Sequence, residues 1–309
     1  MRFHFFVYSL DKETYTPVKK TILTCILFGT WYLAFCQSSE NHRAFTEDFS
    51  SDSSAFFRYG STGNKSPFKY SFGAISPTEP ETKILSFKID PAENAGAGKG
   101  PEIITKKFTH FGTYATRLKV PDVTAIQPNV GAVVGYFTYH VDSVEGLSEI
   151  DFEWLLADPT VIYVGTWTGP PGELRRVGRT INLAEGVIYH TNYRENHTGI
   201  REALTGLQNQ PETVPAVPGF DASKGFYTYG FDWFSDRIRW WMIHPDSGEK
   251  IILWDYQGTT RGIPQHRSKY RMNFWHTKDW SVETNPLSIE PPLHPYELEI
   301  DWMSYEPLH

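Results

Sequence analysis

Three acidic residues, Glu149, Asp151 and Glu153, alternate with apolar residues in one short segment of the chain. Alternate side chains of a β-strand point to the same face, so this spacing predicts three carboxyl groups side by side on one face of a sheet. Mutual repulsion in such a row raises the affinity of at least one carboxyl group for protons, a cost that a purely structural strand has no reason to carry. A metal site, an inverting pair of acids and a solvated strand face are the alternatives that the spacing leaves open.

Cleavage of a glycosidic bond is one reaction that such a row could perform. It needs a carboxylic acid that protonates the leaving oxygen and a carboxylate that acts as nucleophile or base on the other side of the sugar. Glu149 and Glu153 are the natural pair, and a negative charge on Asp151 between them would help keep a neighbour protonated. Cα atoms four residues apart on a strand are about 13 Å apart. The side chains must therefore lean together on a curved sheet to reach the roughly 5 Å of a double displacement.

Short strands are the elements expected to position these acids. Four segments rich in β-branched and aromatic residues are bounded by turn residues, namely residues 83–89, 114–120, 132–139 and 237–243. The chain has 24 glycines and 21 prolines, as many tight connections require. No repeat and no linker divides it after residue 40, so residues 38–309 are expected to form a single all-β sandwich. Residues 201–223 are polar and contain prolines, which predicts a long loop beside or over the site.

The N-terminal residues 1–37 are expected to be a signal region rather than part of the fold. Lys19 and Lys20 precede an apolar run of roughly 15 residues that ends at Cys36, which is short for a membrane span. Translation that begins near Val18 would leave the upstream residues out of the signal. We expect a secreted or periplasmic protein; a lipid anchor at Cys36 is disfavoured because bulky Phe35 precedes it. Both cysteines of the chain lie in this region, so the mature fold is expected to have no disulfide.

Charge and composition narrow the class of partner. The formal charge is −7, and removal of residues 1–37, which carry four basic and two acidic residues, makes it −9. Such an acidic protein is a poor candidate for binding nucleic acid or anionic lipid. Aromatic residues make up 16% of the chain, ten of them tryptophan, and flat rings with a polar edge suit the faces of sugars. We therefore expect a monomer that binds a polysaccharide, although a β-sandwich core would use part of these rings.

The segment Glu149–Glu153 resembles the Glu-x-Asp-x-Glu signature of glycoside hydrolase family 16, which includes lichenases, laminarinases, agarases, carrageenases and xyloglucan transglycosylases. Other segments resemble the family in the same order along the chain, at residues 100–103, 108–119, 137–139, 226–233, 271–275, 279–280 and 299–305. The resemblance runs from about Phe45 to the C-terminus. It implies a concanavalin-like β-jelly-roll sandwich of two curved antiparallel sheets with a concave substrate cleft.

The resemblance also implies a role for individual residues. In an endo-acting, retaining mechanism Glu149 would be the nucleophile, Asp151 its assisting partner and Glu153 the general acid/base. Six residues would line the sugar subsites, namely Glu102, Phe137, Tyr139, Trp167, Asn273 and Trp275, with core packing or a turn as the alternative role of each. No cofactor is required, but Asp301 matches a position that binds structural calcium in some members.

Three positions depart from lichenase-like members of the family. Those members tend to have Arg where this chain has Ile104, Trp where it has Leu147 and Asn where it has Gly165. The departures count against a simple mixed-linkage glucanase, although a β-glucan is still the preferred substrate. The absence of an extra residue between Asp151 and Glu153 argues against the bulged strand of laminarinases and agarases. A transglycosylase and a noncatalytic sugar-binding module on the same fold are the alternative functions.

Overall fold

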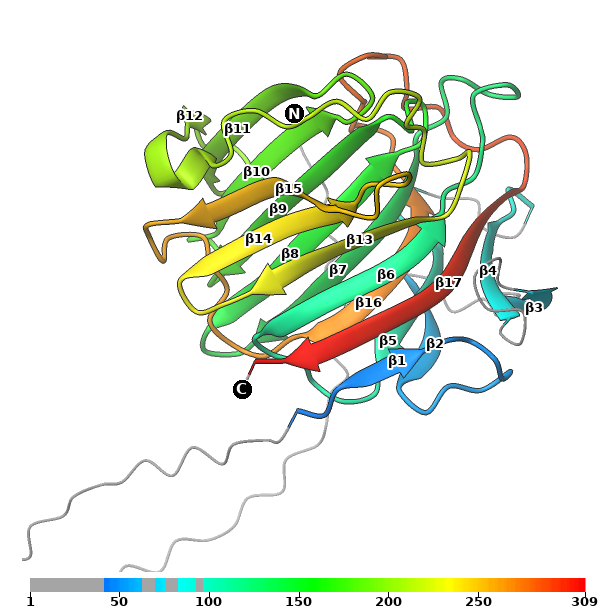
Figure 1. Cartoon of the computed structure of the whole chain (residues 1–309), viewed down its shortest axis with the longest axis horizontal. Coiled ribbons are helices and arrows are strands. Elements are labelled where there is room, and N and C mark those ends of the chain that lie inside the picture. The colour runs from blue at the N-terminus through cyan, green and yellow to red at the C-terminus, as the bar shows by residue number, and fades with distance from the viewer. Residues whose placement is uncertain (1–41, 63–69, 76–82, 93–96, 309) are drawn as a thin grey trace, which may run out of the picture.

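The chain folds into short strands that pair into two antiparallel sheets, and the two sheets lie face to face (Figure 1). The computed structural model describes residues 42–62, 70–75, 83–92 and 97–308. The predicted signal region, with Val18 and Cys36, lies outside the described residues, so export and the lipid anchor stay predictions. No helix in the described ranges is long and apolar enough to cross a membrane.

One sheet, here called the β8 sheet, contains the acidic segment. Its strands lie in the order β12 (Glu202–Ala203), β11 (Val187–Glu195), β10 (Arg175–Asn182), β9 (Val161–Gly169), β8 (Gly146–Leu155), β7 (Ala132–Asp142), β16 (Lys269–His276), β5 (Gly100–Thr105) and β2 (Phe57–Thr62). Strands β7 to β11 are consecutive in the chain and each pairs with the next, so the centre of the sheet is built from hairpins. Strands β5 and β16 come from distant parts of the sequence.

The other sheet, here called the β13 sheet, covers the inner face of the first. Its strands lie in the order β15 (Lys250–Gln257), β14 (Arg237–Ile243), β13 (Tyr227–Trp233), β6 (Gly112–Lys119), β17 (Tyr296–Pro307), β4 (Lys83–Ile89) and β3 (Tyr70–Ile75), and β1 (Phe45–Glu47) pairs with β17. The prediction of a sandwich of two antiparallel sheets is confirmed. The predicted strands 83–89 and 237–243 coincide with β4 and β14, and the other two lie mainly within β6 and β7.

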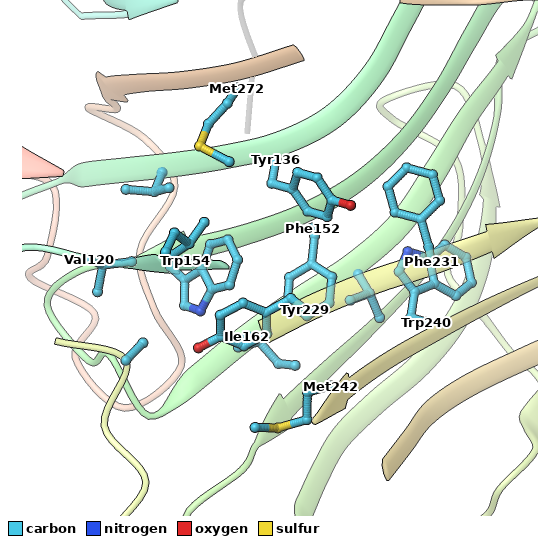
Figure 2. Packing of buried hydrophobic residues seen from close by; sticks show 14 of the residues in the cluster. Val120, Tyr136, Phe152, Trp154, Ile162, Tyr229, Phe231, Trp240, Met242 and Met272 are labelled. Carbon is cyan, nitrogen blue, oxygen red and sulfur yellow. The ribbon is translucent and has the colours of Figure 1, made fainter. Parts of the chain in front are cut away.

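Large aromatic side chains fill the space between the sheets. Phe152 and Trp154 of β8 stack with ring centres 4.9 Å apart, and both contact Tyr229 of β13 (Figure 2). Each of these side chains is fully buried. Burial of one such side chain stabilises the fold by about 1.5–3 kcal/mol, so the inner face of β8 holds the strand firmly in the sandwich.

Residues 201–223 form mostly irregular structure, as their polar composition predicts, but they are not wholly external. The segment contains β12 and a short 3₁₀ helix, η1 (Gly206–Asn209), and η1 packs against β15. Val214, Val217 and Phe220 are buried in the core. The few apolar residues of the segment therefore close one edge of the sandwich, which a reading of average polarity does not reveal.

Arg179 of β10 connects the two sheets at this edge. Its guanidinium donates hydrogen bonds to Thr191 Oγ1 and to the carbonyl oxygens of Pro211 and Leu253, each at 2.9 Å, and to Asn209 Oδ1 at 2.7 Å. A buried charge is costly unless its donors are satisfied. These four bonds offset that cost and join β10, β11, β15 and the 201–223 segment.

Candidate active site

The three acids lie on the outer face of β8. Glu149, Asp151 and Glu153 are partly exposed, and the residues between them are buried in the core. This is the alternation that the spacing in the sequence predicts. The acids therefore share one face of the β8 sheet, the face that is turned away from the sandwich core.

A tryptophan of the opposite sheet holds the acidic strand from behind. The indole Nε1 of Trp240, on β14, donates a hydrogen bond of 3.0 Å to the carbonyl oxygen of Asp151. The ring of Trp240 stacks on Trp254 of β15 at 4.9 Å. A contact in the core thus fixes the backbone at the middle acid, and the local sequence gives no sign of it.

The surroundings of the three carboxyl groups raise their pKa values. Each group is only partly exposed to solvent, and the protein around it disfavours the charged form. Burial raises the pKa of Glu153 to about 7, and burial together with repulsion by Glu153 raises that of Glu149 to about 8. No hydrogen bond within the described ranges stabilises the charged form of these groups. The two glutamates interact, so near neutral pH they share a proton as a pair.

Asp151 lies between the two glutamates on β8. Burial, followed by repulsion from Glu149 and Glu153, raises its pKa well above the ordinary value for an aspartate. A central position between two acids makes ionisation least favourable there. Burial and the two neighbouring acids therefore disfavour the charged form of Asp151.

Strands β7 and β9 surround the acids on both sides. Tyr139 and Trp167 lie directly opposite Glu149, one on each neighbouring strand. Phe137 lies opposite Asp151 and is 9% exposed. Three of the six predicted subsite residues are thus adjacent to the acids, from strands next to β8.

A buried ion pair flanks the site on the β7 side. Arg271 of β16 lies opposite Phe137, and its Nη1 is 3.2 Å from Oε1 of Glu102 on β5. Burial raises the pKa of Glu102, and the Arg271 charge opposes this shift. Arg271 also lies directly opposite Ile104, the position where lichenase-like members tend to have Arg. The positive charge absent from position 104 therefore comes from the neighbouring strand.

Asn273 lies two residues further along β16, opposite Gly135 of β7 and Glu102 of β5. Its Oδ1 is buried and has no hydrogen-bond partner among the described residues. A side chain at Gly135 would place its Cβ only 2.5 Å from this oxygen, so it would displace the Asn273 amide. A buried acceptor without a donor is costly, which suits Asn273 to accept a hydrogen bond from a ligand hydroxyl.

Cations flank the site on the β9 side. Arg176 of β10 lies opposite Trp167 and also opposite Arg194 of β11. The guanidinium carbons of Arg176 and Arg194 lie 5.7 and 5.0 Å from the centre of the Trp167 ring, and the His197 ring lies 4.5 Å from it. The Trp167 ring is therefore packed by the protein's own cations, and a role as a platform for sugar stays a prediction.

Aromatic residues extend the outer face beyond Glu153. Trp275 and Trp280 are partly buried against a small apolar cluster that includes Tyr163, the residue opposite Glu153. The rings of Tyr163 and Trp280 meet edge to face at 4.9 Å, and the Tyr163 hydroxyl donates to Glu283. Trp275 thus lies on the face of the acids, where its role in a sugar subsite stays a prediction, and the 279–280 segment supports that face through Tyr163.

Asp301 is separate from this site. It lies on β17 of the β13 sheet, at an irregularity in the pairing with β6, and its Oδ2 is 2.5 Å from Nη1 of Arg117. No group of three His, Cys, Asp or Glu side chains that could hold a metal ion occurs in the described ranges. Calcium at Asp301 stays a prediction, and the arginine in contact with its carboxylate counts against it.

The comparisons with known proteins agree with this arrangement. The model of the family described as glycosyl hydrolases family 16 matches residues 37–304. The chain belongs to this family. The predictions of the family and of its jelly-roll fold are confirmed, and the family is one of glycosidases.

Several bacterial relatives are named β-glucanase. One from Acetivibrio thermocellus is 31% identical over 178 residues, which are 57% of this chain and 37% of the relative. One from Bacillus subtilis (strain 168) is 23% identical over 301 residues, 94% of this chain and 98% of the relative. A solved structure, the Bacillus licheniformis β-glucanase, has a TM-score of 0.50 and 20% identity over 87% of this chain and all of that one, which shows the fold. The chain spans about a third to two thirds of the length of the first three relatives.

Proposed function

We propose that this chain is a retaining glycosidase that cleaves a β-linked polysaccharide within the polymer. The observation that carries this proposal is the row of three carboxyl groups on one face of β8, whose pKa values are raised above their ordinary values. A double displacement needs one protonated and one ionised carboxyl group in the same site. A pair of glutamates that shares a proton near neutral pH meets this need when the proton lies on Glu153, whereas the order of the two pKa values alone would place it on Glu149.

Each acid has a separate role in the proposed mechanism. Glu153 protonates the glycosidic oxygen while the Glu149 carboxylate attacks the anomeric carbon, so the bond to the leaving sugar breaks and a glycosyl ester forms. Glu153, now ionised, then takes a proton from a water molecule, whose oxygen attacks the same carbon and releases Glu149. Asp151, protonated between them, can donate a hydrogen bond to the Glu149 carboxylate once that group is charged.

A β-glucan is the substrate that we propose. Relatives of the chain are named β-glucanase, and the positive charge expected near the site in such enzymes is supplied by Arg271. Asn273 has an acceptor ready for a sugar hydroxyl, and Tyr139, Phe137 and Trp275 present rings on the same face. Rings and few polar groups are what a neutral sugar requires.

Release of reducing ends from lichenan, laminarin and xyloglucan tests the proposal. We expect wild-type protein to cut at least one β-glucan and Glu149→Gln to lose at least about a thousandfold in kcat, because the nucleophile is lost. Glu145→Gln is the matched control, since this exposed acid lies just before β8 and should leave activity unchanged. Equal activity of wild type and Glu149→Gln would refute the mechanism.

The configuration of the first product tests retention separately. Proton NMR during early turnover should show the β-anomer from a β-linked polymer, because two displacements at the anomeric carbon restore its configuration. Initial release of the α-anomer would show a single displacement and would contradict the role of Glu149 as nucleophile.

A further inference from the structure

We propose that Arg176 is a positioning residue. Its guanidinium lies over Gly178 and favours the ionised forms of the three acids. The proposal rests on the roles proposed for Glu149 and Glu153, and it adds a residue that neither the sequence motif nor the family resemblance marks. Its basis is the geometry of β10, together with the lack of a carboxylate within ion-pair distance of Arg176 among the described residues.

The Arg176 side chain folds back along its own strand toward the acids. A Cβ added to Gly178 would lie 2.6 Å from Nη1, 2.8 Å from Cζ and 2.9 Å from Nη2 of Arg176. The guanidinium therefore occupies the space that a side chain at position 178 would take. Gly178 lies opposite Gly165 on β9, and Gly165 lies opposite Asp151 on β8. Neither of the two residues in line between β10 and Asp151 therefore carries a side chain.

Neighbouring groups keep the guanidinium in this place. The Trp167 ring centre lies 5.7 Å from Cζ of Arg176, within the range of a cation–π contact. Arg194 lies directly opposite Arg176, and like charges in opposite positions repel. Arg176 takes part in no ion pair of 4.0 Å or less within the described part of the chain. Its charge is therefore not neutralised locally and acts on the acids.

The electrostatics of the acids agree with this geometry. The Arg176 charge lowers the pKa of Glu149, of Asp151 and of Glu153, against the larger effect of burial. For Glu153 it is the main opposing influence. The other charged or titratable groups near these acids and Arg176 come from each surrounding strand, from the residues after β11 and from the 277–285 segment. They are Arg271, Glu102, Tyr139, Tyr163, His190, Arg194, His197, Arg201 and Glu283.

The glycine pair also explains one departure from lichenase-like members. Those members favour an amide side chain at the position of Gly165, beside Asp151. Here no side chain leaves β9 at that point, and the guanidinium of Arg176 lies over the adjacent glycine instead. The guanidinium of Arg176 thus lies close to the position that a neutral amide occupies in those members. A positive charge there favours ionisation of the proposed nucleophile, Glu149, at lower pH.

The test is a carboxyl ¹³C NMR titration of the full chain, together with the pH profile of kcat on the best β-glucan. In Arg176→Gln we expect the apparent pKa values of the acids and the acidic limb of the profile to rise by about one pH unit. Gly178→Ala keeps the arginine but forces its guanidinium away, and should shift both in the same direction. Arg176→Lys, which keeps the charge, should shift them less than Arg176→Gln.

Arg175→Gln is the matched control. Arg175 is the preceding residue of β10, it is exposed and its side chain points to the other face. Its variant should titrate as wild type. Titrations of Arg176→Gln and Gly178→Ala that equal those of wild type would overturn the proposal, whatever the activity. If wild type cuts no glycan but both variants shift the titration, the role of Arg176 stands and the proposed function fails.

Discussion

An arginine lies near the acids on each side of strand β8, and the two arginines differ in their neighbours. On the β7 side, Arg271 is buried and its charge is neutralised by Glu102 at 3.2 Å. On the β9 side, Arg176 is partly exposed and faces Arg194. Both cations lower the pKa of Glu149, but only Arg271 has a carboxylate partner of its own. The comparison shows that two arginines can act on the same acid while only one of them is held in an ion pair within the described residues, so their loss should affect stability differently.

The largest expected effect is loss of the buried pair on the β7 side. Glu102→Gln leaves the Arg271 guanidinium buried without its counter-charge, and we expect the free energy of unfolding to fall by about 3–5 kcal/mol. Urea unfolding at pH 7 measures the change. Glu145→Gln, which removes an exposed acid, should change it by less than about 0.5 kcal/mol. A loss no larger than in this control would mean that the pair does not stabilise the fold.

The two strands next to β8 each have a glycine opposite one of the acids, Gly165 on β9 and Gly135 on β7, and we expect substitution of the two glycines to differ in its cost to stability. A Cβ at Gly165 would lie 2.4 Å from the carbonyl oxygen of Val177, so Gly165→Ala must displace backbone and should cost about 1–3 kcal/mol of unfolding free energy. A Cβ at Gly135 meets the Asn273 side chain instead, which can rotate. Gly135→Ala should therefore be the milder change in thermal unfolding and should raise KM. The reverse order of stability would contradict this description of the two sides.

The pH dependence of the free energy of unfolding tests whether the pKa values of Glu149 and Glu153 are raised in the folded protein. The folded pKa values of Glu149 and Glu153 are raised above the unfolded value of 4.5, so the folded protein binds protons more tightly than the unfolded chain. The stability linked to these groups is complete below pH 4.5 and is lost as the pH rises through 7 to 8. Relative to wild type, Glu149→Gln should gain about 1–2 kcal/mol at pH 8 compared with pH 4.5. Parallel curves for the two proteins would exclude this linkage.

The smallest expected effect is on the β9 side. Arg176→Gln removes repulsion with Arg194 and also removes attraction to the acids, so the free energy of unfolding should change by less than about 1 kcal/mol at pH 7. Arg271→Gln, the same substitution on the β7 side, should cost more because Glu102 loses its partner. Equal losses in urea unfolding would remove the distinction between the two arginines.

The sequence predicted the strands and the shared face of the acids because both depend on local alternation. The limits of β4 and β14 follow from short runs of apolar residues between turn residues. The charges around the acids could not be predicted in this way. Arg271 and Glu102 are 169 residues apart, and only the order of strands in the sheet brings them together. The bond from Trp240 to Asp151 spans 89 residues and joins the two sheets.

Arg176 shows a second limit of sequence reasoning. Its strand and face follow from alternation, but the direction of its long side chain depends on the absence of a side chain at Gly178 and on the Trp167 ring. The 201–223 segment shows a third limit. Its average polarity predicts an external loop, yet where Val214, Val217 and Phe220 pack depends on the open edge between two sheets, which sequence alone does not display.

Side chains of β8 alternate between the acidic face and the core, so this strand does not tolerate a change in its number of residues. Insertion or deletion of one residue within β8 would turn the three acids into the core and the aromatic residues into solvent, with loss of fold and catalysis together. The hairpin before it, at the exposed residues 143–145, can absorb such changes without altering either face. Natural variation in chain length is therefore expected to gather in that hairpin and to be absent from the ten residues that follow it.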